Sequence, residues 1–129
     1  MEGKSLIPED IVISIVDDDI SVRRSTRRLL RSSGFHTEAF ASAEEFLNSS
    51  HLSDTNCLIL DVRMPGMNGL ELQRRLAASH RSIPVIFITA HGDEEARVRA
   101  LNGGAVEYLL KPFSEDALLK GIDKALKPK

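Results

Sequence analysis

The sequence is poor in cysteine and has no long hydrophobic run. Its one cysteine, Cys57, cannot form a disulfide within the chain, and because it opens a short apolar run we expect a buried, unreactive thiol. Every apolar run is far shorter than the roughly 18 residues that a transmembrane helix needs. The first residues, MEGKSLIPED, carry acids in place of the hydrophobic segment of a signal peptide. We therefore predict a cytoplasmic protein without membrane contact.

The sequence also lacks a strong charge of either sign. Its 17 Lys and Arg against 19 Asp and Glu give a net charge of -2, so there is no general excess of positive charge to attract nucleic acid. The hydrophobic content of 42% and charged content of 28% are typical of a globular protein. The length of 129 residues suits one domain. We predict a single domain over residues 1–129, with its core at about residues 10–126.

The chain alternates short apolar runs with helical patterns. Runs at 11–16, 35–40, 57–60, 85–88 and 105–110 are typical of parallel strands covered on both faces. Helices are predicted over 20–33, after Ser42, after Asn68, over 93–102 and after Ser114, where polar side chains and capping boxes provide start signals. This alternation predicts an α/β fold, a five-stranded doubly wound parallel sheet of (βα)5 type with strand order 2-1-3-4-5.

Reactive polar residues follow four of the five predicted strands. Asp17 and Asp18 follow the first strand, Asp61 the third, Thr89 closes the fourth and Lys111 follows the fifth. In a sheet of this order the second strand is an edge, and the crevice lies at the carboxyl ends of the first and third strands. These side chains are therefore expected to converge in one crevice.

Three carboxylates in one crevice predict a site for Mg²⁺, or for Mn²⁺ in its place. Mg²⁺ takes one or two carboxylates, keeps several waters and accepts a phosphate oxygen. Ionised Asp17, Asp18 and Asp61 carry -3, which Mg²⁺ and the Lys111 ammonium together bring to zero. A phosphoryl group could then be accepted, and Asp61 is the best candidate nucleophile because it stands alone at its strand end.

Four segments, IVDDD, LILDVRMPGMNG, VIFITAHGD and YLLKPF, resemble the receiver domain of bacterial two-component response regulators over nearly the whole chain. The acid pair, the single aspartate, the threonine and Lys-Pro occur in the family's order. Lys111-Pro112 resembles the family's cis peptide. The segments MPGMNG and ITAHGD look most like receivers linked to a LuxR-type DNA-binding domain.

The resemblance implies a role for each residue of the crevice. Asp61 is the phosphoacceptor and Asp18 a direct Mg²⁺ ligand. Asp17 holds the metal site largely through water, and the backbone carbonyl of Arg63 completes the protein ligands. Asp19, the family's common third acid, is expected to begin the first helix, where its charge suits the helix dipole.

Thr89 and Tyr108 match the family's switch pair, in which the hydroxyl moves toward the phosphoryl group and the ring turns inward. From the residues alone, Tyr108 is a half-buried strand aromatic with its hydroxyl in solvent. The switch would change the packing of the fourth helix, fifth strand and fifth helix, whose surface would be the output and could form a homodimer. Val98, Leu101 and Leu119 are candidates for that surface.

Five arginines on the first predicted helix fall opposite its apolar stripe. They are Arg23, Arg24, Arg27, Arg28 and Arg31. They form either a solvated face or a docking surface for a sensor histidine kinase, with contact to nucleic acid less favoured because no recognition helix-turn-helix follows the last helix. Any DNA binding would need an output domain absent from this sequence.

Two other functions compete with the receiver. A small Mg²⁺-dependent phosphatase of the haloacid dehalogenase kind would use Asp17 as nucleophile and leave Asp61 unexplained. A flavodoxin-like nucleotide-binding module would need a phosphate loop where the sequence has three aspartates, which repel phosphate. We therefore predict a signalling switch that catalyses only its own phosphorylation and dephosphorylation, not a metabolic enzyme.

Overall fold

The computed structural model describes residues 10–127, in which five strands alternate with five helices. Residues 1–9 and 128–129 of the predicted domain lie outside the described part. The strands are β1 (Val12–Val16), β2 (His36–Phe40), β3 (Cys57–Asp61), β4 (Val85–Thr89) and β5 (Glu107–Leu110). The helices are α1 (Ile20–Ser32), α2 (Ala43–Leu47), α3 (Gly69–Ala78), α4 (Glu94–Asn102) and α5 (Glu115–Leu126).

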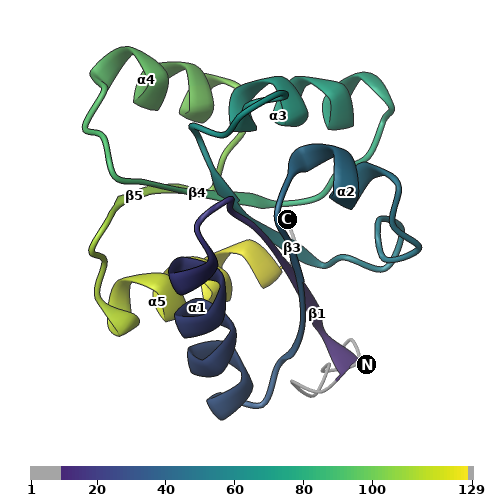
Figure 1. Cartoon of the computed structure of the whole chain (residues 1–129), viewed down its shortest axis with the longest axis vertical. Coiled ribbons are helices and arrows are strands. Elements are labelled where there is room, and N and C mark those ends of the chain that lie inside the picture. Colours follow the sequence, from purple (N-terminus) through teal and green to yellow (C-terminus); the bar gives the residue numbers. More distant parts are fainter. Residues whose placement is uncertain (1–9, 128–129) are drawn as a thin grey trace.

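All five strands are parallel and lie in the order β2-β1-β3-β4-β5, as the alternating pattern predicts. Helices α1 and α5 cover one face of the sheet, and α2, α3 and α4 cover the other (Figure 1). Each face has its own apolar core, built around Ile13 and Ile59 on the α1 and α5 side and around Leu58 and Phe87 on the opposite side. The fold is a three-layer α/β sandwich.

Polar side chains begin the helices at the predicted places. Asp19 accepts hydrogen bonds from the backbone N–H groups of the first turn of α1, which confirms it as the start of that helix. Asn68 and Glu71 form a complete capping box at α3. At α2, Ser42 caps the helix, but the Glu45 carboxylate reaches back to the N–H of Ala41 and not to that of Ser42.

Three further predictions can be compared with the structure. The Cys57 thiol is buried, and burial raises its pKa to about 12, so it is unreactive as expected. The last strand is shorter than predicted, since it begins at Glu107. Among residues 10–127, no helix combines the length and the apolar character that crossing a membrane requires.

The arginines of α1 do not form one uniform solvated face. Arg24, Arg28 and Arg31 are exposed, but Arg23 and Arg27 are partly buried. The guanidinium of Arg23 donates a 2.7 Å hydrogen bond to the backbone carbonyl of Asp17, at the end of β1. The periodic pattern places these residues opposite the apolar stripe, but it does not reveal that a long side chain folds back over the start of its own helix.

Candidate functional site

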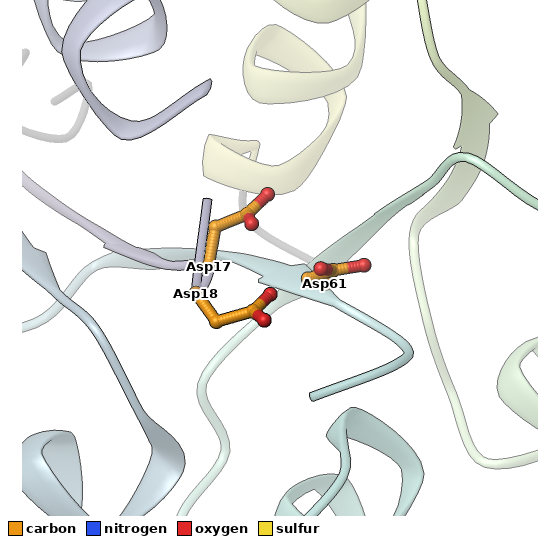
Figure 2. Close-up of side chains that lie close together, drawn as sticks. All are labelled: Asp17, Asp18 and Asp61. Carbon is orange, nitrogen blue, oxygen red and sulfur yellow. The ribbon is translucent and has the colours of Figure 1, made fainter. Parts of the chain in front are cut away.

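The side chains of Asp17, Asp18 and Asp61 come together at the carboxyl ends of β1 and β3. These strands are neighbours in the sheet, with Val16 beside Leu60, so the residues that follow also lie side by side. One carboxylate oxygen of each aspartate lies within 4.8 Å of those of the other two. Figure 2 shows the three side chains extending from the two strand ends into the same region. The predicted convergence of the acids is confirmed.

Asp17 is the most tightly held of the three acids. Its side chain has no exposed surface, and both of its oxygens have partners. Oδ1 accepts a 2.9 Å hydrogen bond from the backbone N–H of Asp19, and Oδ2 accepts one of 2.8 Å from Nζ of Lys111. The carboxylate is therefore fixed in position and shielded from direct attack on a substrate. Asp18, by contrast, is exposed at the mouth of the crevice.

Lys111 carries positive charge into the crevice from the end of β5, where the peptide bond to Pro112 is cis, as the family resemblance implies. Its Nζ lies 2.8 Å from Oδ2 of Asp17 and 3.6 Å from Oδ2 of Asp61. Burial lowers the pKa of the ammonium, but the hydrogen bond and charge of Asp17 outweigh burial, so the pKa lies above its ordinary value. Lys111 is therefore a permanent cation of the site.

Asp61 differs from an ordinary surface acid in its protonation. Burial, and then the nearby charge of Asp17, raises the pKa of Asp61 to about 7, against the opposing effect of Lys111. Only 5% of the residue is exposed. Lys111 thus compensates only part of the repulsion in the crevice, and Asp61 is the group that gains most from additional positive charge.

The donor set fits a small, hard divalent cation. Carboxylate oxygens are the ligands that Mg²⁺ and Mn²⁺ prefer. When ionised, three carboxylates and one ammonium leave the crevice with a charge of -2, which a divalent cation balances. The backbone N–H of Arg63 lowers the pKa of the Asp61 carboxyl. The role of the Arg63 carbonyl as a ligand stays a prediction.

The loop between β3 and α3 passes very close to Asp61. A Cβ atom on Gly69, the first residue of α3, would lie 2.2 Å from the backbone oxygen of Asp61, so only glycine fits there. The loop is also tied to α2, because the Glu44 carboxylate accepts a 3.0 Å hydrogen bond from the N–H of Met67. That hydrogen bond lowers the pKa of Glu44. Sequence analysis did not identify Glu44, since nothing in the spacing links α2 to this loop.

Thr89 and Tyr108 lie on the neighbouring strands β4 and β5. Thr89 is buried, and its Oγ1 accepts a 3.2 Å hydrogen bond from the N–H of His91. The Tyr108 ring packs against Phe87, with 6.2 Å between ring centroids. The expectation of a solvated Tyr108 hydroxyl is wrong: the oxygen is buried and has no hydrogen-bond partner among the described residues. The ring turns toward the core on the α4 side, which strand alternation alone does not fix for a residue near the sheet edge.

The expected output surface is only partly apolar and exposed. Val98 and Leu101 on α4 are exposed, as is Leu110 at the end of β5. Leu119 on α5 instead packs against the core beneath α1 and α5. Because α5 buries Leu118 and Ile122, the helix turns Leu119 partly inward as well, so this residue is a poor candidate for a surface contact.

Comparison with known proteins supports the resemblance to receiver domains that the sequence motifs indicate. Residues 13–123 match the response regulator receiver domain family. The chain is 50% identical over 111 residues to Nodulation protein W of Bradyrhizobium diazoefficiens, covering 86% of this chain and 49% of that protein. It is 49% identical over 116 residues to the response regulator protein TodT of Pseudomonas putida, covering 90% and 51%. The chain thus spans about half the length of these curated relatives.

The fold also has a counterpart among solved structures. The crystal structure of FixJ-N superimposes with a TM-score of 0.82 at 39% identity, covering 91% of this chain and 94% of that one. This similarity supports the three-layer arrangement described above. From the family match, the relatives and the crevice of acids together, this chain belongs to the response regulator receiver domain family and is a signalling domain of two-component systems.

Proposed function

We propose that Asp61 accepts a phosphoryl group from the phosphohistidine of a sensor histidine kinase. The observation that carries the proposal is the position of Asp61, at the end of a central strand and surrounded by Asp17, Asp18 and Lys111. The ionised carboxylate forms a P–O bond as the P–N bond to the donor imidazole breaks, and the electron pair of that bond stays with the imidazole. Water later hydrolyses the acyl phosphate, so the domain acts as a switch that catalyses only its own modification.

The acids and Arg63 would hold the cation that this transfer needs. Asp18 and Asp61 would bind Mg²⁺ or Mn²⁺ directly, Asp17 largely through water, and Arg63 through its backbone carbonyl. When bound, the cation supplies positive charge beside the phosphoryl oxygens. Asp17 keeps Lys111 in the crevice, because the 2.8 Å ion pair fixes the ammonium next to Asp61. Lys111 then stabilises the charge that develops on the phosphoryl group.

The competing phosphatase reaction is not supported by the geometry. It would require Asp17 as nucleophile, but Asp17 has no exposed surface and both oxygens are occupied by Asp19 and Lys111. The Asp61 side chain keeps 8% of its surface exposed, against none for Asp17, and it lies beside the exposed Asp18. A nucleophile has to reach its substrate, which favours Asp61.

Thr89 and Tyr108 would convert the modification into a conformational change. The Thr89 hydroxyl is proposed to turn from the His91 N–H toward the phosphoryl oxygen. The Tyr108 hydroxyl is buried and has no hydrogen-bond partner within residues 10–127, and such a group costs about 1–3 kcal/mol. A second packing of α4 and β5 in which this hydroxyl finds a partner would therefore be close in free energy. Phosphorylation would shift the population between the two packings.

The α4-β5-α5 surface is the proposed output. Val98 and Leu101 provide exposed apolar area on α4, and a homodimer of phosphorylated chains through this surface is the proposed consequence. The relatives include the transcriptional regulatory protein FixJ, so we propose that the domain controls transcription in the cytoplasm. DNA would be contacted only through an output domain, of LuxR-like type, that this sequence does not include.

The kinase would dock over α1 and the segment after β5. A groove of about 540 Å³ beside Lys111 has an apolar lining that includes Val22, Leu29 and Phe113. The charged residues of its lining are Lys111 and Glu115, whereas the exposed Arg24 and Arg28 lie on the other side of α1. An apolar groove suits a partner helix with an apolar stripe, and its position beside Lys111 would bring the phosphohistidine to Asp61.

The test is the intact mass after incubation with acetyl phosphate, with and without Mg²⁺, for the wild type and for Asp61→Asn. We expect the wild type alone to gain one phosphoryl group, and only with Mg²⁺. Asp54→Asn, an exposed acid on the loop before β3, is the matched control and should be labelled like the wild type. Labelling of Asp61→Asn together with loss of labelling in Asp17→Asn would favour the phosphatase instead.

A further inference from the structure

We propose that Arg63 is a positioning residue that couples the loop after Asp61 to the first turn of α4, through an ion pair with Asp93. The inference rests on the proposed function and adds a physical path from the site to the output surface. Nη2 of Arg63 lies 3.7 Å from Oδ2 of Asp93. The pair joins two segments that come from different strands, β3 and β4, and that meet beside the crevice.

The Arg63 end of this path is attached to the phosphoacceptor. Arg63 lies only two residues after Asp61 in the chain, and its backbone N–H lowers the pKa of the Asp61 carboxyl. A change in the position or charge of the Asp61 side chain therefore acts directly on the Arg63 backbone. The side chain, attached to that same backbone, reaches out of the crevice toward α4.

The Asp93 end is attached to α4. Oδ1 of Asp93 accepts hydrogen bonds from the N–H groups of Glu95 (3.0 Å) and Ala96 (3.4 Å), which makes it the N-cap of the helix. Oδ2 is the atom that faces Arg63. The Asp93 carboxylate thus caps α4 through Oδ1 and contacts Arg63, on the loop after Asp61, through Oδ2.

Helix α4 is held weakly elsewhere, so this contact matters to its position. Ala96 and Ala100 are its only buried residues, and both side chains are small. At its C-terminal end, Gln73 of α3 donates a 3.0 Å hydrogen bond to the carbonyl of Ala100. A helix with so little buried apolar area gains little from hydrophobic packing. Polar contacts at its two ends therefore contribute a large share of what fixes it.

Tyr108 provides a reporter close to this contact. Its ring packs against the core cluster that includes Ala96, in the first turn of α4, and burial, followed by the charge of Asp93, raises the pKa of its phenol. The chain has one tyrosine and no tryptophan, so its intrinsic fluorescence comes essentially from Tyr108. A movement of the first turn of α4 that follows phosphorylation is expected to change this signal.

The experiment measures two quantities on each protein: phosphoryl groups per chain by intact mass, and the change in tyrosine fluorescence after acetyl phosphate and Mg²⁺. The variants are Arg63→Gln, Asp93→Asn and the double variant. Asparagine is as good an N-cap as aspartate, so Asp93→Asn removes the ion pair and keeps the cap. Arg81→Gln, an exposed arginine between α3 and β4, is the matched control.

We expect each single variant to reduce the fluorescence change per phosphoryl group about two- to fivefold, the range that an exposed ion pair supports. The double variant should lose no more of the fluorescence change than either single variant, because each single substitution already removes the same ion pair. Arg63→Lys, which retains the charge, should keep more of the change than Arg63→Gln. The control should match the wild type.

Three results would overturn the inference. They are an unchanged signal per phosphoryl group in both single variants, additive losses in the double variant, and a labelled wild type whose Tyr108 fluorescence does not respond. A wild type that is not labelled at all is a different failure, because it removes the proposed function itself and with it the basis of this coupling.

Discussion

The Nζ atom of Lys111 is paired with Asp17 at 2.8 Å, while Asp61 lies 3.6 Å from the same nitrogen. The two acids are therefore neutralised unequally. Asp17 receives a direct charge-assisted hydrogen bond, whereas Asp61 keeps a pKa of about 7. This inequality makes Asp61 the group that responds when positive charge or a phosphoryl group enters the crevice, and the predictions below depend on it.

The first prediction concerns stability against pH without metal. The pKa of Asp61 is about 7 in the folded protein and about 3.9 in an unfolded chain, so between these values the folded state holds the extra proton. The stabilisation that the protonated Asp61 gives to the folded state is complete below about pH 4 and is lost as the pH rises through 7. Relative to the wild type, Asp61→Asn should therefore become more stable as the pH rises, by an amount on the order of a few kcal/mol at pH 8.

Urea unfolding at pH 5 and pH 8 in EDTA checks this prediction. Asp54→Asn, which removes an exposed acid far from the crevice, controls for the general effect of losing one negative charge. Equal differences between Asp61→Asn and the wild type at the two pH values would show that Asp61 does not titrate in this range.

The second prediction concerns metal binding. A divalent cation favours ionised Asp61, so binding has to displace a proton wherever the pH lies below about 7. The increase in melting temperature caused by Mg²⁺ should therefore be larger at pH 8 than at pH 6. In Asp61→Asn that pH dependence should largely vanish. Thermal unfolding of both proteins at pH 6 and pH 8, in EDTA and in excess Mg²⁺, is the measurement. A shift in the wild type that does not depend on pH would contradict the prediction.

The third prediction compares two lysines. Lys111→Ala leaves the Asp17 carboxylate buried without a counter-charge and should destabilise the protein by about 3 kcal/mol. Lys120 forms an ion pair with Asp116 in which both side chains are more than three-quarters exposed, so Lys120→Ala should cost at most about 1 kcal/mol. Denaturant unfolding at neutral pH without metal measures both. Similar losses in the two variants would mean that Asp17 is solvated after all.

Much of this architecture could be predicted from the sequence because it depends on local patterns. Apolar runs identify the strands, and the order of a doubly wound sheet then fixes which strand ends meet. Asp17, Asp61 and Lys111 could be assigned to one crevice on that basis alone. The helix start at Asp19 depends on one residue and its neighbours, and it is found where expected.

The parts that could not be predicted depend on side-chain directions between elements. The Glu44 hydrogen bond to Met67 and the Arg63–Asp93 pair join segments that no sequence spacing connects. The burial of the Tyr108 hydroxyl depends on how α4 packs over β5, and α4 buries only small side chains. Periodicity indicates which residues share a face of an element. The contacts of long polar side chains, however, are determined only once the elements have packed.

The fourth prediction tests the close approach of the loop to Asp61. Alanine favours a helix over glycine by about 1 kcal/mol, so at most helix positions Gly→Ala is stabilising. At Gly69 the new Cβ would lie 2.2 Å from the backbone oxygen of Asp61 and 3.1 Å from the ring of Phe87. Neither the strand backbone nor a buried ring can move away easily, so the overlap outweighs the helix preference. Gly69→Ala should lose about 2 kcal/mol of stability.

The same substitution should slow labelling by acetyl phosphate, because the loop that carries Arg63 has to move away from the end of β3. Gly92→Ala is the matched control, since its Cβ would meet only the Leu110 side chain at 3.8 Å, an ordinary contact. That variant should stay within about 0.5 kcal/mol of the wild type. Gly69→Ala could be as stable as Gly92→Ala and still be labelled slowly. The loop would then move without any loss of stability, and the substitution would affect Asp61 only through the new position of the loop. If both were as stable and as fast as the wild type, the close packing of this loop against Asp61 would have no part in either stability or phosphoryl transfer.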